Sequence, residues 1–397
     1  MTVSSSITSP VGGRGLTLGQ DPVLEVRGLC VDYGVGPGSV RAVNDAGFTL
    51  RRGEVLGVAG ESGSGKSTLA YALIRLLRAP GVITGGQVLF HSRPMGSTTT
   101  ETVDLLDADA AELRAFRWSE ISVVFQSAMH ALNPVVRIEN QLTDALRQHR
   151  RGMSTADRHE RAVELLRMVG INSDRLSSYP HELSGGMRQR VMIAMALALE
   201  PQIVIMDEPT TALDVVTQRE ILEELMQLRE RLGFALIFIT HDLSLLLEFA
   251  DSIAIMYAGR IVEQASGREL LGAPRHPYSH GLLNSFPALH GERVRMSGIP
   301  GSPPSLKALP SGCKFHVRCP YAMDRCSVEE PLLLQPVGES GTRTVACLLH
   351  DGNQEPPAPL ALTVPAGPSG APWSAESSAA DTTSTTAVDG EPTGSAR

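Results

Sequence analysis

The sequence predicts an α/β fold in which a parallel sheet carries a nucleotide-binding loop. An antiparallel β-subdomain, an inserted α-helical subdomain and a small cysteine-containing C-terminal extension complete the expected architecture. A glycine-rich loop at residues 60–68 lies between an apolar run and helically spaced leucines. Residues 203–206 and 234–239 are continuous apolar runs, which are typical of strands covered on both faces. Helical periodicity fills much of residues 127–199.

The glycine-rich loop fits the pattern G-x-x-x-x-G-K-[ST]. It consists of Gly60, Glu61, Ser62, Gly63, Ser64, Gly65, Lys66, Ser67 and Thr68. Residues 54–59 predict a buried strand before it, and the leucines after it, Leu69, Leu73, Leu76 and Leu77, predict a helix. Glycines let backbone N–H groups and the positive end of that helix surround an anion. In this pattern Lys66 reaches the β- and γ-phosphates and Ser67 binds Mg²⁺, so a P-loop nucleoside-triphosphatase core is predicted.

Composition and charge restrict the class of protein. The 397 residues suffice for one large domain with an appendage, and 42% apolar residues supply a core. A formal net charge of −8 argues against a protein built to wrap nucleic acid. No run approaches the roughly 20 apolar residues that span a bilayer, so we expect a cytoplasmic chain that meets the membrane through partners. Five cysteines in a reducing compartment suit metal binding better than disulfides.

The N-terminal part of the chain predicts a leader followed by a β-layer. Residues 1–20 are rich in Ser, Thr and Gly and are expected to be disordered. Apolar alternation at 22–33, continued by 40–50, predicts an antiparallel β-layer ahead of the P-loop. Tyr33 ends its first strand, where it suits a core aromatic and a platform for an adenine base equally well.

The rest of the core alternates strands and helices. Residues 87–90 and 121–125 predict two further strands. Within residues 127–199, apolar stripes predict helices that form a subdomain inserted between core strands. Residues 221–232 predict a crossover helix that completes a βαβ unit. The P-loop pattern does not recur, so the chain holds the parts of one nucleotide site.

Two further motifs accompany the P-loop. Asp207 and Glu208 follow an apolar strand, where Asp207 suits a Mg²⁺ ligand and Glu208 a general base; an exposed acidic pair beginning a turn is the alternative. The turn Leu183-Ser184-Gly185-Gly186 opens an apolar helix and provides a second helix start with free N–H groups. One ATP can use both helix starts only if two chains meet head to tail, so a dimer is predicted.

These motifs together resemble an ABC transporter ATPase domain over residues 21–265. The ordered set is the P-loop, Gln126, the motif at 183–186, Asp207-Glu208, Thr211-Ala212-Leu213-Asp214 and His241. The resemblance implies that Tyr33 stacks on adenine, that Glu208 is the catalytic base and that His241 hydrogen-bonds the γ-phosphate. It also implies that Gln126 senses Mg²⁺ and the attacking water, so that Ser67, Gln126 and Asp207 surround the ion.

The same resemblance assigns residues to a dimer. Leu183, Ser184, Gly185 and Gly186 would contact ATP bound to the opposite subunit, and Asp214 would lie at the interface. The partner would be a homologous second ATPase subunit in a heterodimer. Two transmembrane permease subunits would dock on the helical subdomain around residues 126–142, and an extracytoplasmic peptide-binding protein would deliver cargo. The chain would be peripheral at the cytoplasmic face of the membrane, with no nucleic-acid partner.

Two segments narrow the resemblance to oligopeptide and dipeptide permease ATPases. Residues 125–134, FQSAMHALNP, are similar to the Gln-loop of that group and depart from it at Ser127 and Ala128. His276-Pro277-Tyr278 resembles the segment appended in the same group. The implied function is ATP hydrolysis that powers import of di- or oligopeptides. Nickel and glutathione importers carry similar extensions, and a soluble ABC ATPase acting on nucleic acid or ribosomes is the alternative of another class.

Four of the five cysteines gather in the expected extension at 266–350. Cys313, Cys319, Cys326 and Cys347 suit a tetrahedral thiolate site, but their spacing matches neither a zinc ribbon nor a compact ferredoxin run. Some peptide-permease ATPases are thought to carry a [4Fe-4S] cluster here, so the resemblance favours that cluster over Zn²⁺, with unliganded buried cysteines as the third alternative. Residues 351–397 are rich in Pro, Ala, Ser and Thr and predict a disordered tail.

Overall fold

The computed structural model describes residues 21–93, 100–125, 131–211, 213–285, 298–339 and 341–353. All of them belong to one unit of the chain, residues 1–362. The predicted leader at 1–20, the predicted ligand Gln126 and most of the predicted tail lie outside the described residues.

A seven-stranded sheet forms the centre of the fold, in the order β11-β10-β9-β3-β8-β7-β6. Its strands are β3 (Val55–Ala59), β6 (Ile121–Val124), β7 (Ile203–Asp207), β8 (Ala235–Ile239), β9 (Ser252–Tyr257), β10 (Arg260–Ala265) and β11 (Thr344–Val345). The strands from β9 to β6 run parallel, and β10 and β11 are antiparallel. Every residue of β3, β6, β7 and β8 is buried, as the continuous apolar runs predict.

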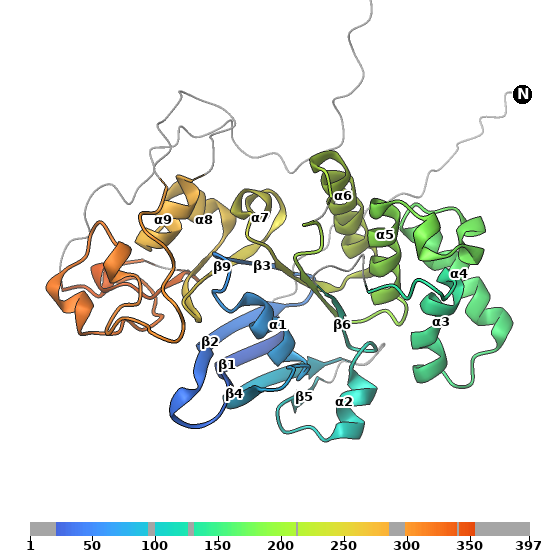
Figure 1. Ribbon diagram of the computed structural model, residues 1–397, viewed down its shortest axis with the longest axis horizontal. Helices are drawn as coiled ribbons and strands as arrows, with labels where there is room; N and C mark the ends of the chain where they lie inside the picture. The colour runs from blue at the N-terminus through green and yellow to red at the C-terminus, as the bar shows by residue number, and fades with distance from the viewer. Residues whose placement is uncertain are drawn as a thin grey trace, which may run out of the picture. The chain divides into compact units, whose positions relative to one another are not determined.

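A second sheet is antiparallel and has the order β2-β1-β4-β5. It consists of β1 (Pro22–Tyr33), β2 (Val40–Arg51), β4 (Gly81–Ser92) and β5 (Glu101–Asp104). One apolar cluster joins Leu24 of β1, Ile205 of β7 and Leu69 of helix α1 (Lys66–Leu73). The antiparallel layer therefore packs on one face of the central sheet, with α1 against it (Figure 1).

Helices pack against the opposite face of the central sheet. Before residue 250 they are α3 (Ile138–His149), α4 (Thr155–Met168), α5 (Gly185–Ala196), α6 (Val215–Leu232) and α7 (Leu243–Phe249), whereas α2 (Ala110–Phe116) lies with α1 on the side of the antiparallel layer, where Phe116 packs on Phe90. A second apolar cluster joins Leu165 of α4, Val191 of α5 and Val204 of β7. Figure 1 shows α3, α4 and α5 grouped together, so the predicted helical subdomain is formed.

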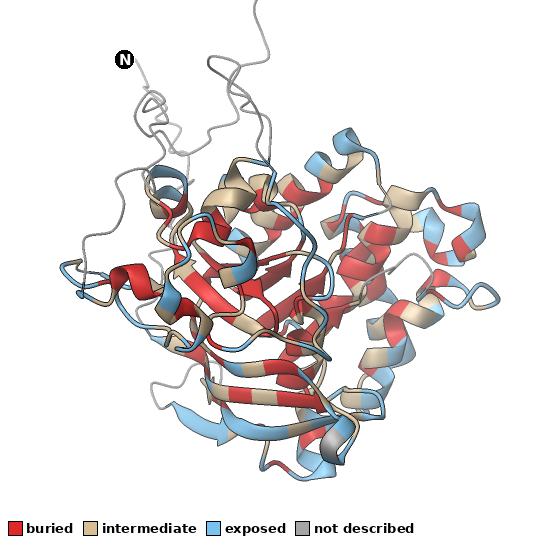
Figure 2. Ribbon diagram, turned by 60° about the vertical axis from the view of Figure 1, so that its left-hand side comes forward, coloured by how far each residue is buried: buried red, intermediate tan, exposed pale blue. Residues whose placement is uncertain are grey.

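The C-terminal region packs on the core through short elements. They are α8 (Gly267–Gly272), α9 (Pro277–Leu283), β11 and the 3₁₀ turns η5 (His316–Arg318), η6 (Asp324–Ser327) and η7 (Leu348–His350). Three further 3₁₀ turns, η1 (Gly36–Gly38), η3 (Ser173–Ser177) and η4 (Pro180–Glu182), lie earlier in the chain. Tyr278 and Phe315 belong to the same apolar cluster as the central strands. Figure 2 shows the buried residues concentrated in those strands. The extension thus contributes a strand and side chains to the core.

Helix α1 ends earlier than the leucine spacing predicts. The spacing of Leu69, Leu73, Leu76 and Leu77 extends the helix to residue 77, but α1 stops at Leu73. Arg75 has φ +51°, a left-handed conformation that ends a helix. The Arg117 guanidinium donates to the carbonyls of Ile74 and Arg75 at 2.9 and 2.8 Å, which satisfies groups that a longer helix would use.

Candidate nucleotide-binding site

The P-loop is pressed against two neighbouring backbone segments. Gly60 has φ +152° and Gly65 has φ +103°, conformations that favour glycine. A Cβ atom on Gly60 would lie 2.2 Å from the Met256 carbonyl oxygen, and one on Gly65 would lie 2.4 Å from the Ala42 carbonyl oxygen. The loop can therefore approach β9 and β2 this closely only with glycine at both positions.

Lys66 folds over the loop that precedes it. Its Nζ donates to the Gly60 carbonyl at 2.8 Å and to the Glu61 carbonyl at 3.0 Å. Burial lowers the pKa of Lys66, and the nearby carboxylates of Glu208 and Asp207 oppose this shift. A buried ammonium whose acceptors, within the described part of the chain, are two carbonyls is suited to receive the oxygens of a phosphate.

Ser67 and Asp207, both predicted Mg²⁺ ligands, contact each other at the P-loop. The Ser67 hydroxyl donates to Oδ1 of Asp207 at 3.0 Å. Asp207 is fully buried at the end of β7, burial raises its pKa, and its Oδ2 has no hydrogen-bond partner among the described residues. A hydroxyl and a buried carboxylate with a spare oxygen fit the oxygen ligands that Mg²⁺ prefers.

Glu208 and His241 also lie together. Oε1 of Glu208 is 3.5 Å from Nδ1 of His241, and Oε2 accepts a hydrogen bond from Thr211 Oγ1 at 3.1 Å. Glu208 has φ +47°, which is uncommon for a residue with a side chain and is often found at functional sites. The turn after β7 thus directs this carboxylate toward the residue that follows β8.

Tyr33 lies beside the helix that begins in the P-loop. Its hydroxyl is 3.3 Å from Oγ1 of Thr68, and its side chain is half-buried at the end of β1. This position leaves the aromatic side chain next to the phosphate-binding loop, where the resemblance places the base of the nucleotide.

The Leu-Ser-Gly-Gly motif is separate from the P-loop within one chain. Ser184 is exposed and caps α5 by accepting the Met187 N–H at 3.2 Å. Among the described residues no hydrogen bond or ion pair joins residues 183–186 to residues 60–68. Asp214 caps α6 by accepting both N–H and O–H of Thr217 at 3.0 and 2.7 Å.

Two residues of the C-terminal region contact the P-loop, which the sequence analysis missed. The Arg318 guanidinium pairs with the Glu61 carboxylate, and the Tyr278 hydroxyl accepts the Glu61 N–H. Both residues stand in motifs noted from the sequence, beside Cys319 and within His276-Pro277-Tyr278. Their spacing carries no information about a contact so distant in the chain.

The four clustered cysteines converge on one small cavity. Cys313, Cys319, Cys326 and Cys347 line it together with His276 and Phe315. Burial raises the pKa of Cys313, of Cys319 (to about 11) and of Cys347. The described residues nevertheless contain no group of three or more His, Cys, Asp or Glu side chains placed to hold a metal ion.

Known proteins resemble the chain along most of its length. A family profile described as ABC transporter matches residues 43–211, and one described as oligopeptide/dipeptide transporter, C-terminal region, matches residues 262–326. The oligopeptide transport ATP-binding protein OppD of Salmonella typhimurium is 46% identical over 312 residues, which make up 78% of this chain and 90% of the relative. The chain belongs to this family of ABC transporter ATP-binding proteins.

Another ABC relative and a solved structure agree with this membership. The dipeptide transport ATP-binding protein DppD of Escherichia coli is 41% identical over 313 residues, or 78% of this chain and 92% of the relative. The dimeric ATP-binding cassette MJ0796, in a post-hydrolysis state with ADP and phosphate, superposes with a TM-score of 0.54 at 30% identity, covering 62% of this chain and 99% of the cassette. The predicted fold class is confirmed, and the chain is an ATPase. Among the described helices, none has the length and apolar character needed to cross a bilayer.

Proposed function

We propose that this chain powers the import of di- or oligopeptides by hydrolysing ATP at the cytoplasmic face of the membrane. The observation that carries the proposal is the convergence of Ser67, Asp207, Glu208 and His241 on a P-loop within a chain that also has the C-terminal region of peptide transporters. In this proposal residues 21–265 are the ATPase domain and residues 266–350 the extension.

The described side chains would divide the work of hydrolysis. The N–H groups of the loop, the start of α1 and the Lys66 ammonium would bind the β- and γ-phosphates, and Tyr33 would stack on the adenine. Ser67 and Asp207 would hold Mg²⁺ together with Gln126, which lies outside the described residues, and the bound ion would neutralise charge on the phosphoryl oxygens. Glu208 would take the proton of the attacking water while His241, 3.5 Å away, fixes the carboxylate.

The other half of each ATP site would come from a homologous second ATPase subunit. Ser184, Gly185 and Gly186 open α5 and are not fully buried, as a motif that contacts another subunit requires. Val215 and Val216, which directly follow Asp214, are 81% and 69% exposed. Large apolar side chains with this exposure beside the predicted interface residue suit a subunit contact.

Two transmembrane permease subunits would dock on the helical subdomain. A groove of about 430 Å³ lies there, lined by residues that include Trp118, Asn133, Gln141, Leu142 and Arg147. Val135 lies between the lining residues Asn133 and Val136 in the sequence, and it is 79% exposed. A mixed apolar and polar groove of this kind suits a short helix of a membrane partner, while an extracytoplasmic peptide-binding protein would supply the cargo.

The cargo is tested with the complex reconstituted from the chain, its second ATPase subunit, the permease subunits and the binding protein. ATP hydrolysis is measured with di- to octapeptides, Ni²⁺ and glutathione, and in a separate arm with nucleic acid. Stimulation by peptides alone is expected. Stimulation by Ni²⁺ or glutathione would show that the cargo assignment is wrong and leave the ATPase mechanism unchanged. A response to nucleic acid, with no response to any of these solutes, would show that the chain does not serve an importer.

We further propose that the four-cysteine cavity holds a [4Fe-4S] cluster in preference to Zn²⁺. Support comes from the convergence of Cys313, Cys319, Cys326 and Cys347 on one cavity, where a cation would offset the cost of buried thiolates. The test is the iron, sulfide and zinc content and the visible absorption of chain purified without oxygen. Iron and sulfide in equal amounts are expected; zinc alone, or no metal, would overturn the cluster.

A further inference from the structure

Glu61, the second residue of the P-loop, is held at all three of its polar groups. Its carboxylate accepts two hydrogen bonds from Arg318, Nη1 to Oε2 at 2.8 Å and Nη2 to Oε1 at 3.0 Å. Its N–H donates to the Tyr278 hydroxyl at 2.9 Å. Its carbonyl accepts from Lys66 Nζ and from the Ser64 N–H. Three of these five hydrogen bonds come from the C-terminal extension, more than 200 residues further along the chain.

Arg318 is committed to this contact. Its side chain is only 4% exposed, and its remaining donors bind the carbonyls of Pro300 and Gly301 and the Tyr257 hydroxyl. A guanidinium has five N–H donors in a rigid planar fork, so these acceptors and the two carboxylate oxygens fix its orientation. A bidentate pair held in this way resists movement of the Glu61 side chain.

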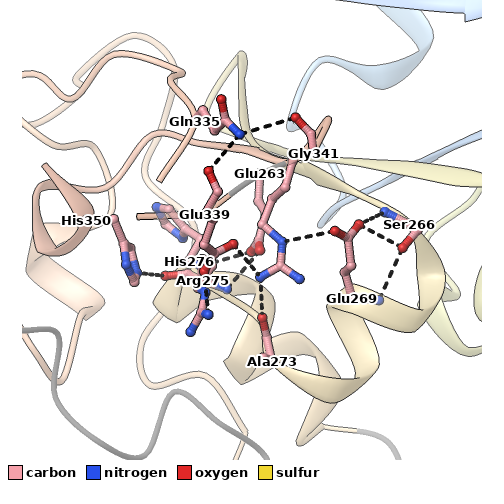
Figure 3. A network of polar contacts seen from close by, with 11 residues as sticks. Glu263, Ser266, Glu269, Ala273, Arg275, His276, Gln335, Glu339, Gly341 and His350 are labelled. Carbon is pink, nitrogen blue, oxygen red and sulfur yellow. Dashed lines mark hydrogen bonds and ion pairs between the residues drawn. The ribbon is translucent and has the colours of Figure 1, made fainter. Parts of the chain in front are cut away.

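Tyr278 is equally fixed. It is fully buried, and its ring lies 4.6 Å from that of Tyr257 and 5.4 Å from that of Phe315, centroid to centroid. Its own N–H donates to Nδ1 of His276, and the buried Glu263 accepts the N–H groups of Arg275 and His276 at 2.8 and 2.9 Å. Figure 3 shows Glu263 at the centre of this network, which anchors the start of α9 on β10. The Tyr278 hydroxyl therefore reaches the P-loop from a rigid base.

The sign of the charge gives the contact a role in binding. Glu61 places a carboxylate in a loop whose ligand is a polyphosphate, and like charges at close range oppose each other. Arg318 neutralises this carboxylate, and the Glu61 side chain is 26% exposed. We infer that Arg318 and Tyr278 of the C-terminal extension are positioning residues of the ATP site, which shape the P-loop and remove the charge of Glu61 from the bound phosphates. This inference rests on the phosphate-binding role proposed for residues 60–68.

The test compares the assembled transporter with Arg318→Met, in which the methylene packing is largely kept and the charge is lost. Because this variant loses a bidentate charged contact, KM for ATP should rise by about 10-fold, while kcat should stay within about 2-fold of wild type. The second variant, Tyr278→Phe, keeps the ring packing, and a rise in KM of about 3-fold is expected because the Glu61 N–H loses its acceptor. Direct binding of MgATP to each full-length variant should weaken by the same factors.

The double variant Arg318→Met/Glu61→Gln tests whether Arg318 acts on ATP binding by neutralising Glu61 or only attaches the extension to the core. Removing the carboxylate should bring KM back to within about 3-fold of wild type, because no unpaired charge then faces the phosphates. The matched control is Arg325→Met, since Arg325 pairs with Glu329 at 2.7 Å in the same extension and touches no P-loop residue. Its KM should stay at the wild-type value.

Three outcomes would overturn the inference: an unchanged KM in both Arg318→Met and Tyr278→Phe, an equal change in Arg325→Met, or no recovery in the double variant. Lys66→Ala distinguishes this failure from failure of the proposed ATP site. If Lys66→Ala abolishes MgATP binding while the Arg318 and Tyr278 variants bind normally, the P-loop assignment stands and only the positioning role is wrong. Normal binding by Lys66→Ala would instead reject the site itself.

Discussion

Glu208 combines an unfavourable backbone conformation with two polar neighbours. Its left-handed φ of +47° directs the carboxylate toward His241 and Thr211. Conformations of this kind cost on the order of 1–3 kcal/mol and persist where the surrounding structure fixes them. Its backbone N–H donates to the Ile239 carbonyl at 2.9 Å, so the end of β8 supplies that restraint. The position is suited to a group that must stay aligned with a water molecule.

Glu208→Gln should therefore abolish turnover and preserve ATP binding. Glutamine keeps the shape and the hydrogen bond from Thr211 but cannot take a proton, so kcat of the assembled transporter should fall by at least about 100-fold. MgATP affinity, measured at equilibrium on the full chain, should stay within about 2-fold of wild type. Turnover that survives this substitution would show that another group accepts the proton.

Glu54 allows a prediction about pH. It is buried next to β3, accepts the Arg51 N–H at 2.7 Å, and burial raises its pKa above its ordinary value of 4.5. The folded chain therefore holds a proton at pH values where the unfolded chain has lost it, so this group adds stability as pH falls toward 4.5. Relative to Glu54→Gln, wild type should gain free energy of unfolding between neutral pH and pH 5, measured by urea denaturation. If the difference in free energy of unfolding stayed constant or changed in the opposite direction, burial would not raise the pKa of Glu54.

At this scale the sequence could predict which side chains surround the phosphates but not what holds the loop. Parallel strands bring their carboxyl ends to one edge of the sheet. At or after such ends lie Lys66 and Ser67 (after β3), Asp207 (the last residue of β7) and His241 (after β8). The pairing of Arg318 with Glu61 spans 257 residues. Neither motif nor periodicity encodes such a contact, because it depends on how the extension folds back on the core.

The elements themselves follow from apolar patterning, with their ends set by other parts of the chain. Residues 203–206 and 234–239 became buried strands because a sheet covered on both faces needs continuous apolar runs. Helix α6 begins at Val215, earlier than residue 221 where its apolar stripe becomes evident, because Asp214 caps it with two hydrogen bonds. Helix α1 ends at Leu73 despite further leucines, because Arg117 binds the carbonyls that follow.

Arg117→Met tests the end of α1. The substitution removes both hydrogen bonds to the carbonyls of Ile74 and Arg75, and the free energy of unfolding should fall by about 1–3 kcal/mol. KM for ATP should stay near wild type, since the P-loop lies at the other end of the helix. The control is Arg114→Met, because Arg114 is an exposed residue of α2 for which no side-chain contact is described. Equal destabilisation by both variants would mean that the two hydrogen bonds do not stabilise this end of α1.

For the molecule as a whole, the extension completes the core that the sequence assigned to residues 21–265. Strand β11 is only two residues long, too short for any periodicity to reveal, yet it pairs with β10 through Glu263 and Gln264. The Ala346 N–H then donates to the Val262 carbonyl at 2.8 Å. Tyr257 packs against Tyr278 and Phe315, so an aromatic side chain of the core is covered from the extension.

A chain ended after residue 265 should consequently fail as an independent domain. It would expose the edge of β10, uncover Tyr257 and leave Glu61 without Arg318, and an unpaired apolar strand edge promotes aggregation. The matched control is a chain ended after residue 353, which keeps every contact described here. Size-exclusion chromatography and thermal unfolding of both chains give the measurement. The shorter chain should aggregate or unfold at a lower temperature, because residues that lie after the ATP-binding core in the sequence cover part of that core. Equal stability of the two chains would mean that residues 21–265 fold as a stable domain without the extension.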